Sequence, residues 1–128
     1  MICWNARSIN TFGALERLIN LSRIHNLSMI AILELFANLS QLDSYRIQML
    51  MNNGHSNPNS KILLFWSSEV NCSILESDQQ HITCEVSHDE CSAKFQMNYV
   101  YAKCKDHLRR PLWDNMLKWS ETGYPWCI

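Results

Sequence analysis

The chain has 128 residues, of which 47% are hydrophobic and 18% are charged, and its formal net charge is −1. This hydrophobic content is enough to build a core and excludes a wholly disordered chain. The length allows one domain, or part of a domain that is commonly longer. The nearly neutral charge excludes a strongly basic nucleic-acid-binding protein, so such a role must rest on a local group of basic residues.

The chain carries no sequence signal for a membrane. Its longest apolar stretch, residues 27–36, contains Ser28 and Glu34 and is too short to span a bilayer. No charged segment followed by an apolar one and a cleavage site opens the chain. We therefore expect no membrane partner and a location inside the cell, in the nucleus or the cytoplasm.

The six cysteines form no C-x-x-C pair, so neither a zinc ribbon nor a thioredoxin-like redox motif is supported. We expect reduced, structural thiols, as in most intracellular proteins. Four of the six fall in apolar, strand-like runs, where a thiol behaves as a small buried hydrophobic group. These four are Cys3, Cys72, Cys84 and Cys127.

The first half of the chain predicts two strands, each followed by a helix. Residues 2–6 predict a strand, and apolar residues at helical spacing predict a helix over 15–24. The continuous apolar run 28–33 is typical of a strand covered on both faces. A second helix is expected over 39–51, and the turn-rich segment 52–59 comes after it.

From residue 61 onward the apolar residues alternate with a period of two. Short polar breaks separate four expected strands, and connections this short favour an antiparallel meander. An amphipathic helix over 108–119 and a last strand over 124–128 complete the chain. This order predicts an α/β (α+β) sandwich in which a mixed sheet is flanked by helices. The four expected strands are 61–66, 72–75, 81–86 and 94–102.

Two polar residues stand where predicted strands end. Asn5 follows the apolar start of the chain, and Glu34 follows the run 28–33. If these strands are parallel neighbours joined by the helix between them, both side chains emerge at one edge of the sheet. Amide and carboxylate oxygens suit a hard cation such as Mg²⁺. The alternative is that Asn5 starts a turn and Glu34 is simply solvated.

A group of basic residues follows the predicted strand 94–102 and continues into the start of the last predicted helix. Such a group can track the phosphate backbone of a nucleic acid. A solvated helix start is an equally ordinary explanation. The residues are Lys103, Lys105, Arg109 and Arg110.

Four short motifs, in this order, resemble those of the endonuclease/exonuclease/phosphatase superfamily. Residues 4–10 (WNARSIN) resemble its opening "WNxRG(I/L)" strand, and residues 32–34 (ILE) resemble its second motif, "LxET". Residues 100–104 (VYAKC), followed by 109–113 (RRPLW), resemble a "VYA" strand leading into "R..LW..L". Residues 124–128 (YPWCI) resemble the strand before the family's "GDFN" motif. The likeness is greatest to the apurinic-type endonuclease domain of plant non-LTR (LINE-type) retrotransposons.

The resemblance implies the N-terminal half of the superfamily's sandwich, a truncated domain over 1–128 that ends just before "GDFN". It also implies Mg²⁺-dependent nicking of DNA in retrotransposition. In such enzymes the residues matching Asn5 and Glu34 hold the metal, and the tyrosine matching Tyr101 contacts the scissile phosphate. A basic residue, here Arg109 or Arg110, meets the nucleic-acid backbone.

The sequence also departs from the family pattern. The aspartate and asparagine of "GDFN" and the later Asp-His pair have no counterpart, and Ser8, Leu35 and Cys104 replace usual residues. Losing a water-activating group costs roughly 10²–10⁴ in rate. We therefore expect an inactive remnant of the endonuclease; the alternatives are a non-catalytic nucleic-acid-binding module and a degenerate fragment with no molecular function. An uncovered sheet edge would favour self-association.

Overall fold

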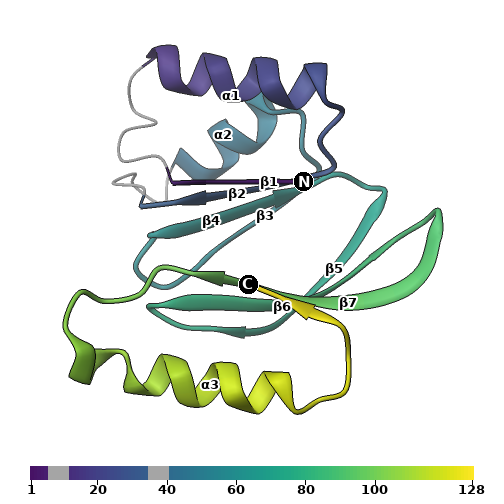
Figure 1. Ribbon diagram of the computed structural model, residues 1–128. Helices are drawn as coiled ribbons and strands as arrows, with labels where there is room; N and C mark the ends of the chain where they lie inside the picture. Colours follow the sequence, from purple (N-terminus) through teal and green to yellow (C-terminus); the bar gives the residue numbers. More distant parts are fainter. Residues whose placement is uncertain (6–11, 35–40) are drawn as a thin grey trace.

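The computed structural model describes residues 1–5, 12–34 and 41–128, which form two sheets and three α-helices in four layers (Figure 1). Helices α1 and α2 cover one sheet, the second sheet packs beneath it, and α3 covers the outer face of the second sheet. No helix in these ranges is long and apolar enough to cross a membrane. In chain order the elements are β1 (Ile2–Asn5), α1 (Phe12–Ile24), β2 (Met29–Leu33), α2 (Leu42–Gln48), β3 (Asn53–Ser56), β4 (Ile62–Trp66), β5 (Val70–Ser77), β6 (His81–His88), β7 (Cys91–Val100), the 3₁₀ helix η2 (Asp106–Leu108), α3 (Arg110–Ser120) and β8 (Trp126–Cys127).

The two sheets have the strand orders β1-β2-β4-β3 and β5-β6-β7-β8. In the first sheet β1 and β2 are parallel and joined by α1, whereas β4 runs antiparallel to both β2 and β3. In the second sheet β5, β6 and β7 form an antiparallel meander, and β8 pairs parallel to β7. The predicted α+β class, with mixed sheets flanked by helices, is therefore confirmed.

Two predictions about the strands are wrong. Strand β4, which we expected in the meander, pairs with β2 in the other sheet because all but its last residue are buried on both faces. The segment 52–59, which we expected to be a turn, contains the edge strand β3, which pairs with β4. Because this segment is polar, its sequence pattern did not indicate a strand. Ala6 and residues 39–40, the margins of two further predicted elements, lie outside the described residues.

Strands β2 and β4 divide their side chains between two hydrophobic cores. From β2, Ile30 and Ile32 face the helices, whereas Met29 and Ala31 face the second sheet, and each is at most 3% exposed. Coverage on both faces explains the continuous apolar run and confirms the prediction made from it. From β4, Leu63 and Phe65 lie on the helix side, and Ile62 and Leu64 lie between the sheets.

The outer face of the second sheet, beneath α3, is polar. His81 and Thr83 of β6 and Gln96 and Asn98 of β7 are all buried. The Thr83 hydroxyl donates to Asn98 Oδ1 at 2.7 Å, and the Thr122 hydroxyl, beyond the end of α3, donates to Gln96 Oε1 at 3.1 Å. Because buried polar groups cost free energy unless they are paired, these bonds are what allows α3 to pack here.

None of the six cysteines forms a disulfide in the structure. Cys84 is buried and Cys72 is half-buried, but Cys3 and Cys127 are exposed. The prediction of burial is therefore wrong for Cys3 and Cys127. Both lie on edge strands, β1 and β8. At the edge of a sheet, an apolar sequence does not ensure that other residues cover the side chain.

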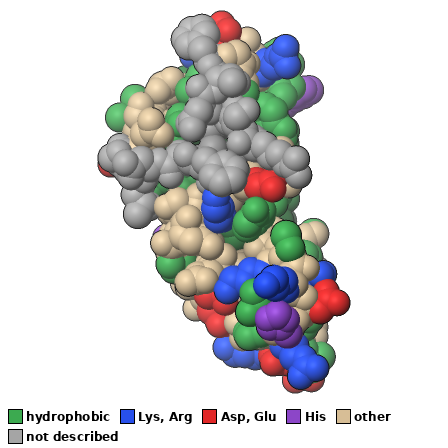
Figure 2. All heavy atoms as spheres, turned by 90° about the vertical axis from the view of Figure 1, so that its left-hand side faces the viewer, with side chains coloured by type: hydrophobic (Ala, Val, Ile, Leu, Met, Phe, Trp, Pro, Cys, Tyr) green, Lys and Arg blue, Asp and Glu red, His purple; other side chains and the backbone are tan. Residues whose placement is uncertain are grey.

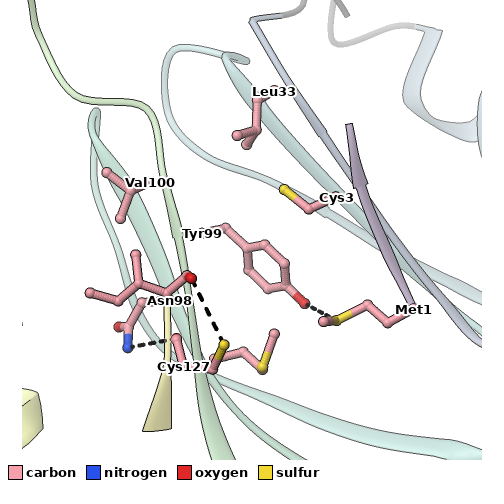
Figure 3. Close-up of a pocket in the computed structure, with 9 residues that line it drawn as sticks. Met1, Cys3, Leu33, Asn98, Tyr99, Val100 and Cys127 are labelled. Carbon is pink, nitrogen blue, oxygen red and sulfur yellow. Dashed lines mark hydrogen bonds between the residues drawn. The ribbon is translucent and has the colours of Figure 1, made fainter. Parts of the chain in front are cut away.

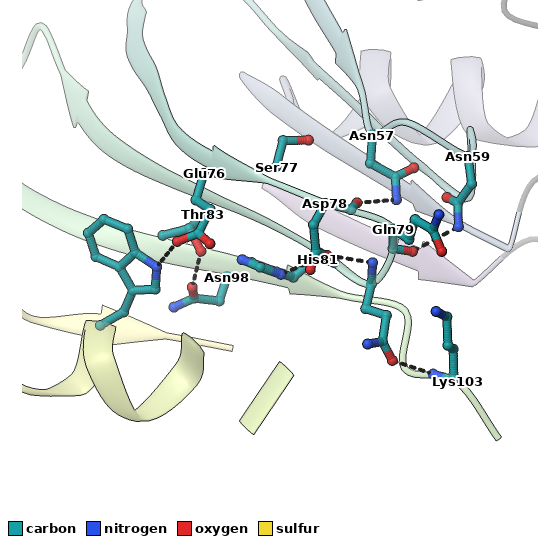
Figure 4. A network of polar contacts seen from close by, with 12 residues as sticks. Asn57, Asn59, Glu76, Ser77, Asp78, Gln79, His81, Thr83, Asn98 and Lys103 are labelled. Carbon is teal, nitrogen blue, oxygen red and sulfur yellow. Dashed lines mark hydrogen bonds and ion pairs between the residues drawn. The ribbon is translucent and has the colours of Figure 1, made fainter. Parts of the chain in front are cut away.

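A buried asparagine joins the turns of the two sheets (Figure 4). Asn57, 1% exposed, lies between β3 and β4, and its Oδ1 accepts hydrogen bonds from two backbone amides at the start of β4, both at 2.9 Å. Its Nδ2 donates to the carbonyl of Asp78, between β5 and β6, at 2.9 Å. The exposed Asn59 makes a parallel bond, from its Nδ2 to the carbonyl of Gln79 at 2.8 Å.

We predict that Asn57→Ala lowers the free energy of unfolding by about 3 kcal/mol, because the Ile62 amide and the Asp78 carbonyl lose the hydrogen bonds that this buried side chain makes. Asn59→Ala, which removes a similar bond in water, should cost less than about 1 kcal/mol. Urea denaturation of the two variants measures the difference. Equal losses would contradict the role given to the buried bond.

Candidate functional site

The parallel pairing of β1 with β2 brings two predicted site residues to the same edge of the first sheet. Asn5 is the last residue of β1 and is exposed, and its partner in the register is Leu33, the last residue of β2. Glu34 follows Leu33 directly. The structure therefore places Asn5 and Glu34 at the carboxyl ends of adjacent parallel strands.

Glu34 adopts an uncommon backbone conformation, with a positive φ of 65°. For a residue that is not glycine this left-handed conformation costs roughly 1–2 kcal/mol. A hydrogen bond from the Glu34 amide to the carbonyl of Lys61, at 2.8 Å, holds the turn against β4. Asn26, Leu50 and Ser60 also have a positive φ, so this conformation by itself marks a turn and not a binding residue.

Tyr101 joins this edge from the other sheet. It follows β7 directly, and its amide donates to the carbonyl of Gln80 at 2.7 Å. Its hydroxyl donates to Glu34 Oε1 in a long hydrogen bond of 3.4 Å. Two residues from separate sequence motifs, 67 positions apart, therefore meet across the sandwich.

The basic cluster, defined as Lys103, Lys105, Arg109 and Arg110, lies at the same end of the molecule. Figure 2 shows Lys and Arg side chains gathered on the lower part of this face. Lys105 and Arg110 are exposed, whereas Lys103 and Arg109 are half-buried. The Arg109 guanidinium donates to the carbonyl of Cys104 at 2.9 Å and pairs with the carboxylate of Asp106. Residues 103–110 contain four basic side chains and one acidic side chain, and further Asp and Glu side chains lie around the basic ones in Figure 2.

Gln80 fixes the chain that carries both Tyr101 and the basic cluster. It is only 4% exposed, its Nε2 donates to the carbonyl of Leu108 at 2.9 Å, and its Oε1 accepts from the Lys103 amide at 3.0 Å. Sequence reasoning missed Gln80. It lies at the end of a polar break between two strands, and nothing in the sequence distinguishes it from its exposed neighbour Gln79.

His81 lies near this end but is not available to a substrate. Its side chain is completely buried, and its Nδ1 lies 2.9 Å from Asp78 Oδ1 (Figure 4). Asp78 Oδ1 also accepts from the backbone amides of Gln80 and His81, at 2.6 and 2.9 Å. This pair therefore shapes the turn between β5 and β6 and has a structural role.

Glu34 and Asn5 offer a hard cation one carboxylate and one amide. Within the described ranges, no group of three or more His, Cys, Asp or Glu side chains could hold a metal ion. Mg²⁺ often binds through only one or two carboxylates and takes its other ligands from water and substrate phosphates. The donor set at this edge fits a cation of that kind, held weakly by the protein alone.

Comparison with known proteins does not assign the chain to a family. No family model matches it. No curated protein gives a significant sequence match either.

We predict that Gln80→Ala lowers the free energy of unfolding by about 2–3 kcal/mol, because the backbone groups of Lys103 and Leu108 lose a buried partner. Gln79→Ala, the matched change at the exposed neighbour, should cost less than about 0.5 kcal/mol. Urea denaturation gives both values, and limited proteolysis should show faster cleavage within residues 101–110 of the Gln80 variant. Similar stabilities and cleavage rates for the two variants would show that Gln80 does not hold this segment.

Proposed function

We propose that this end of the molecule binds the phosphate backbone of DNA, with Mg²⁺ as a weak co-ligand, and that it does so without efficient cleavage. The observation that carries the proposal is the contact between the Tyr101 hydroxyl and the Glu34 carboxylate. It brings the candidate metal ligand and the candidate phosphate contact together, on the same end as the basic cluster.

The basic cluster supplies the electrostatic part of this function. Lys and Arg side chains that neutralise phosphates release condensed counterions, which gives binding that does not depend on base sequence. Arg109 is held by Cys104 and Asp106 and is therefore pre-oriented, whereas Lys105 and Arg110 extend into solvent. An arginine held by hydrogen bonds, with exposed basic side chains on either side of it, suits contact with several backbone phosphates.

The strand ends supply the metal part. Asn5 and Glu34 are the residues that would hold Mg²⁺, and the ion would supply positive charge at a phosphoryl oxygen. The Tyr101 hydroxyl, which donates to Glu34, would turn to donate to a phosphate oxygen instead. Both roles use side chains at one edge, so the cation and the tyrosine can act on the same phosphate.

Cleavage requires more than this arrangement offers. A water must be activated as a nucleophile, and losing the group that does so costs about 10²–10⁴ in rate. The described residues contain no group of three or more His, Cys, Asp or Glu side chains that could hold a metal ion. We therefore propose DNA binding with hydrolysis near background.

The same proposal extends to ancestry. The layering of helix, sheet, sheet and helix, and the positions of Asn5, Glu34 and Tyr101 at the ends of strands, support a domain of the endonuclease/exonuclease/phosphatase type. The motif resemblance supports an origin in a non-LTR retrotransposon endonuclease. A chain that bound no DNA would instead favour a degenerate fragment without molecular function.

We predict that the chain binds duplex DNA with an affinity that falls as salt rises, and that Lys105→Ala and Arg110→Ala each reduce the slope of log K against log salt by about 1. Lys94→Ala is the control, because it removes the same charge from an exposed site at the far end of β7. Fluorescence anisotropy over a salt series measures the slopes. If Lys94→Ala changes the slope as much as the other two, binding is not localised at the basic cluster.

We predict weak Mg²⁺ binding, with a dissociation constant of about 1 mM or weaker, since one carboxylate and one amide leave most of the coordination shell to water. Glu34→Gln should weaken it further, as calorimetry would show. Supercoiled plasmid incubated with Mg²⁺ should be nicked no faster than in its absence. Nicking that needs Mg²⁺ and disappears in Glu34→Ala would establish a complete catalytic site instead.

A further inference from the structure

A cavity of about 200 Å³ lies between the two sheets, and its lining includes Leu33 and Val100, which directly precede Glu34 and Tyr101. Its lining includes residues of β1 and β8, which are edge strands of the first and second sheet, and of β7. Of its nine lining residues, four carry sulfur. These are Met1, Cys3, Met97 and Cys127.

Tyr99 lines this cavity, and its hydroxyl contacts the sulfur atoms of two methionines. Its hydroxyl lies 3.3 Å from Met1 Sδ and 3.2 Å from Met29 Sδ, as hydrogen-bond donor to either. Burial, together with the nearby cysteines, raises the pKa of Tyr99 well above its ordinary value, so the hydroxyl keeps its proton. Figure 3 shows Met1, Cys3 and Cys127 arranged around the Tyr99 ring.

The lining selects the kind of ligand. Structural Zn²⁺ sites usually have four Cys or His ligands, whereas this lining offers two thiols and two thioethers. Thioethers and thiolates are instead the ligands that soft cations prefer, above all Cu(I). Apolar neighbours such as Leu33 and Val100 also penalise a doubly charged ion more than a singly charged one that a thiolate neutralises.

We propose that this cavity binds one soft monovalent cation of the Cu(I) class through the Cys127 thiolate and the thioethers of Met1 and Met97. The Cys127 thiol loses its proton to solvent as the sulfur–metal bond forms, and each methionine donates a sulfur lone pair. The metal keeps its oxidation state. The interactions given up are weak, because the Cys127 thiol contacts the Ile128 carbonyl at 3.8 Å and the Tyr99 hydroxyl can retain Met29.

The test is an anaerobic titration of the full chain with Cu(I) in competition with a chromogenic Cu(I) chelator. The expected result is one tight site per chain, weakened about 10–100-fold by Cys127→Ser and by Met97→Leu. Cys91→Ser, which removes an exposed thiol from the far end of β7, should leave the affinity within about twofold. X-ray absorption of the loaded protein should show copper bound to sulfur alone.

The Met97→Leu variant distinguishes the proposed site, which needs a methionine sulfur, from Cu(I) binding by cysteine thiols alone. Leucine keeps the volume of methionine and leaves the fold intact, which the urea midpoint verifies, but it offers no lone pair. Wild-type Cu(I) affinity in Met97→Leu would overturn the proposal, because binding would then rest on thiols only. An equal loss in Cys91→Ser would also overturn it. So would an apolar dye that occupies the cavity and is not displaced by Cu(I) or Ag(I).

Discussion

The structure depends on one constraint: β2 and β4 are apolar on both faces, so each face must be covered. A single layer against these strands would leave half of their side chains in water, at a cost of roughly 1.5–3 kcal/mol for each large one. The helices α1 and α2 cover one face and the second sheet covers the other. The order of four layers results from this requirement, and the remaining elements are arranged around it.

The same constraint places the polar groups. Because β2 cannot tolerate a charged side chain along its length, its first acidic residue comes where the strand ends, at Glu34. Parallel pairing then sets the end of β1 beside it. Tyr101 has the corresponding position in the second sheet, since β7 buries residues 96–99 and the chain becomes half-buried from Val100 onward. The candidate site therefore lies where the buried strands end and the chain reaches the surface.

Features determined by burial and periodicity are the ones that the sequence predicts best. The run 28–33 indicates a doubly covered strand, and period-two alternation indicates the meander, because both patterns are direct consequences of which faces meet water. Such reasoning fails for β3, a polar edge strand held by pairing rather than by burial, and for the sheet that β4 joins. Asn5 and Glu34 could be placed from strand order alone, whereas Gln80 could not. Its burial depends on how residues 101–108 cross the turn between β5 and β6.

The polar layer beneath α3 has a consequence for motion. Helix α3 buries Leu112 and Met116, and it is otherwise attached through hydrogen bonds such as those from Lys118 and Trp119 to Glu76. Water can replace such bonds at low net cost, whereas it cannot replace the apolar contacts around β2 and β4. The third helix is therefore a cooperative unit that opens before the rest of the fold. An anion that binds Arg109 or Arg110 would stabilise the packed state of α3 by mass action. The helix would therefore become more rigid as more of the basic cluster is occupied by anions.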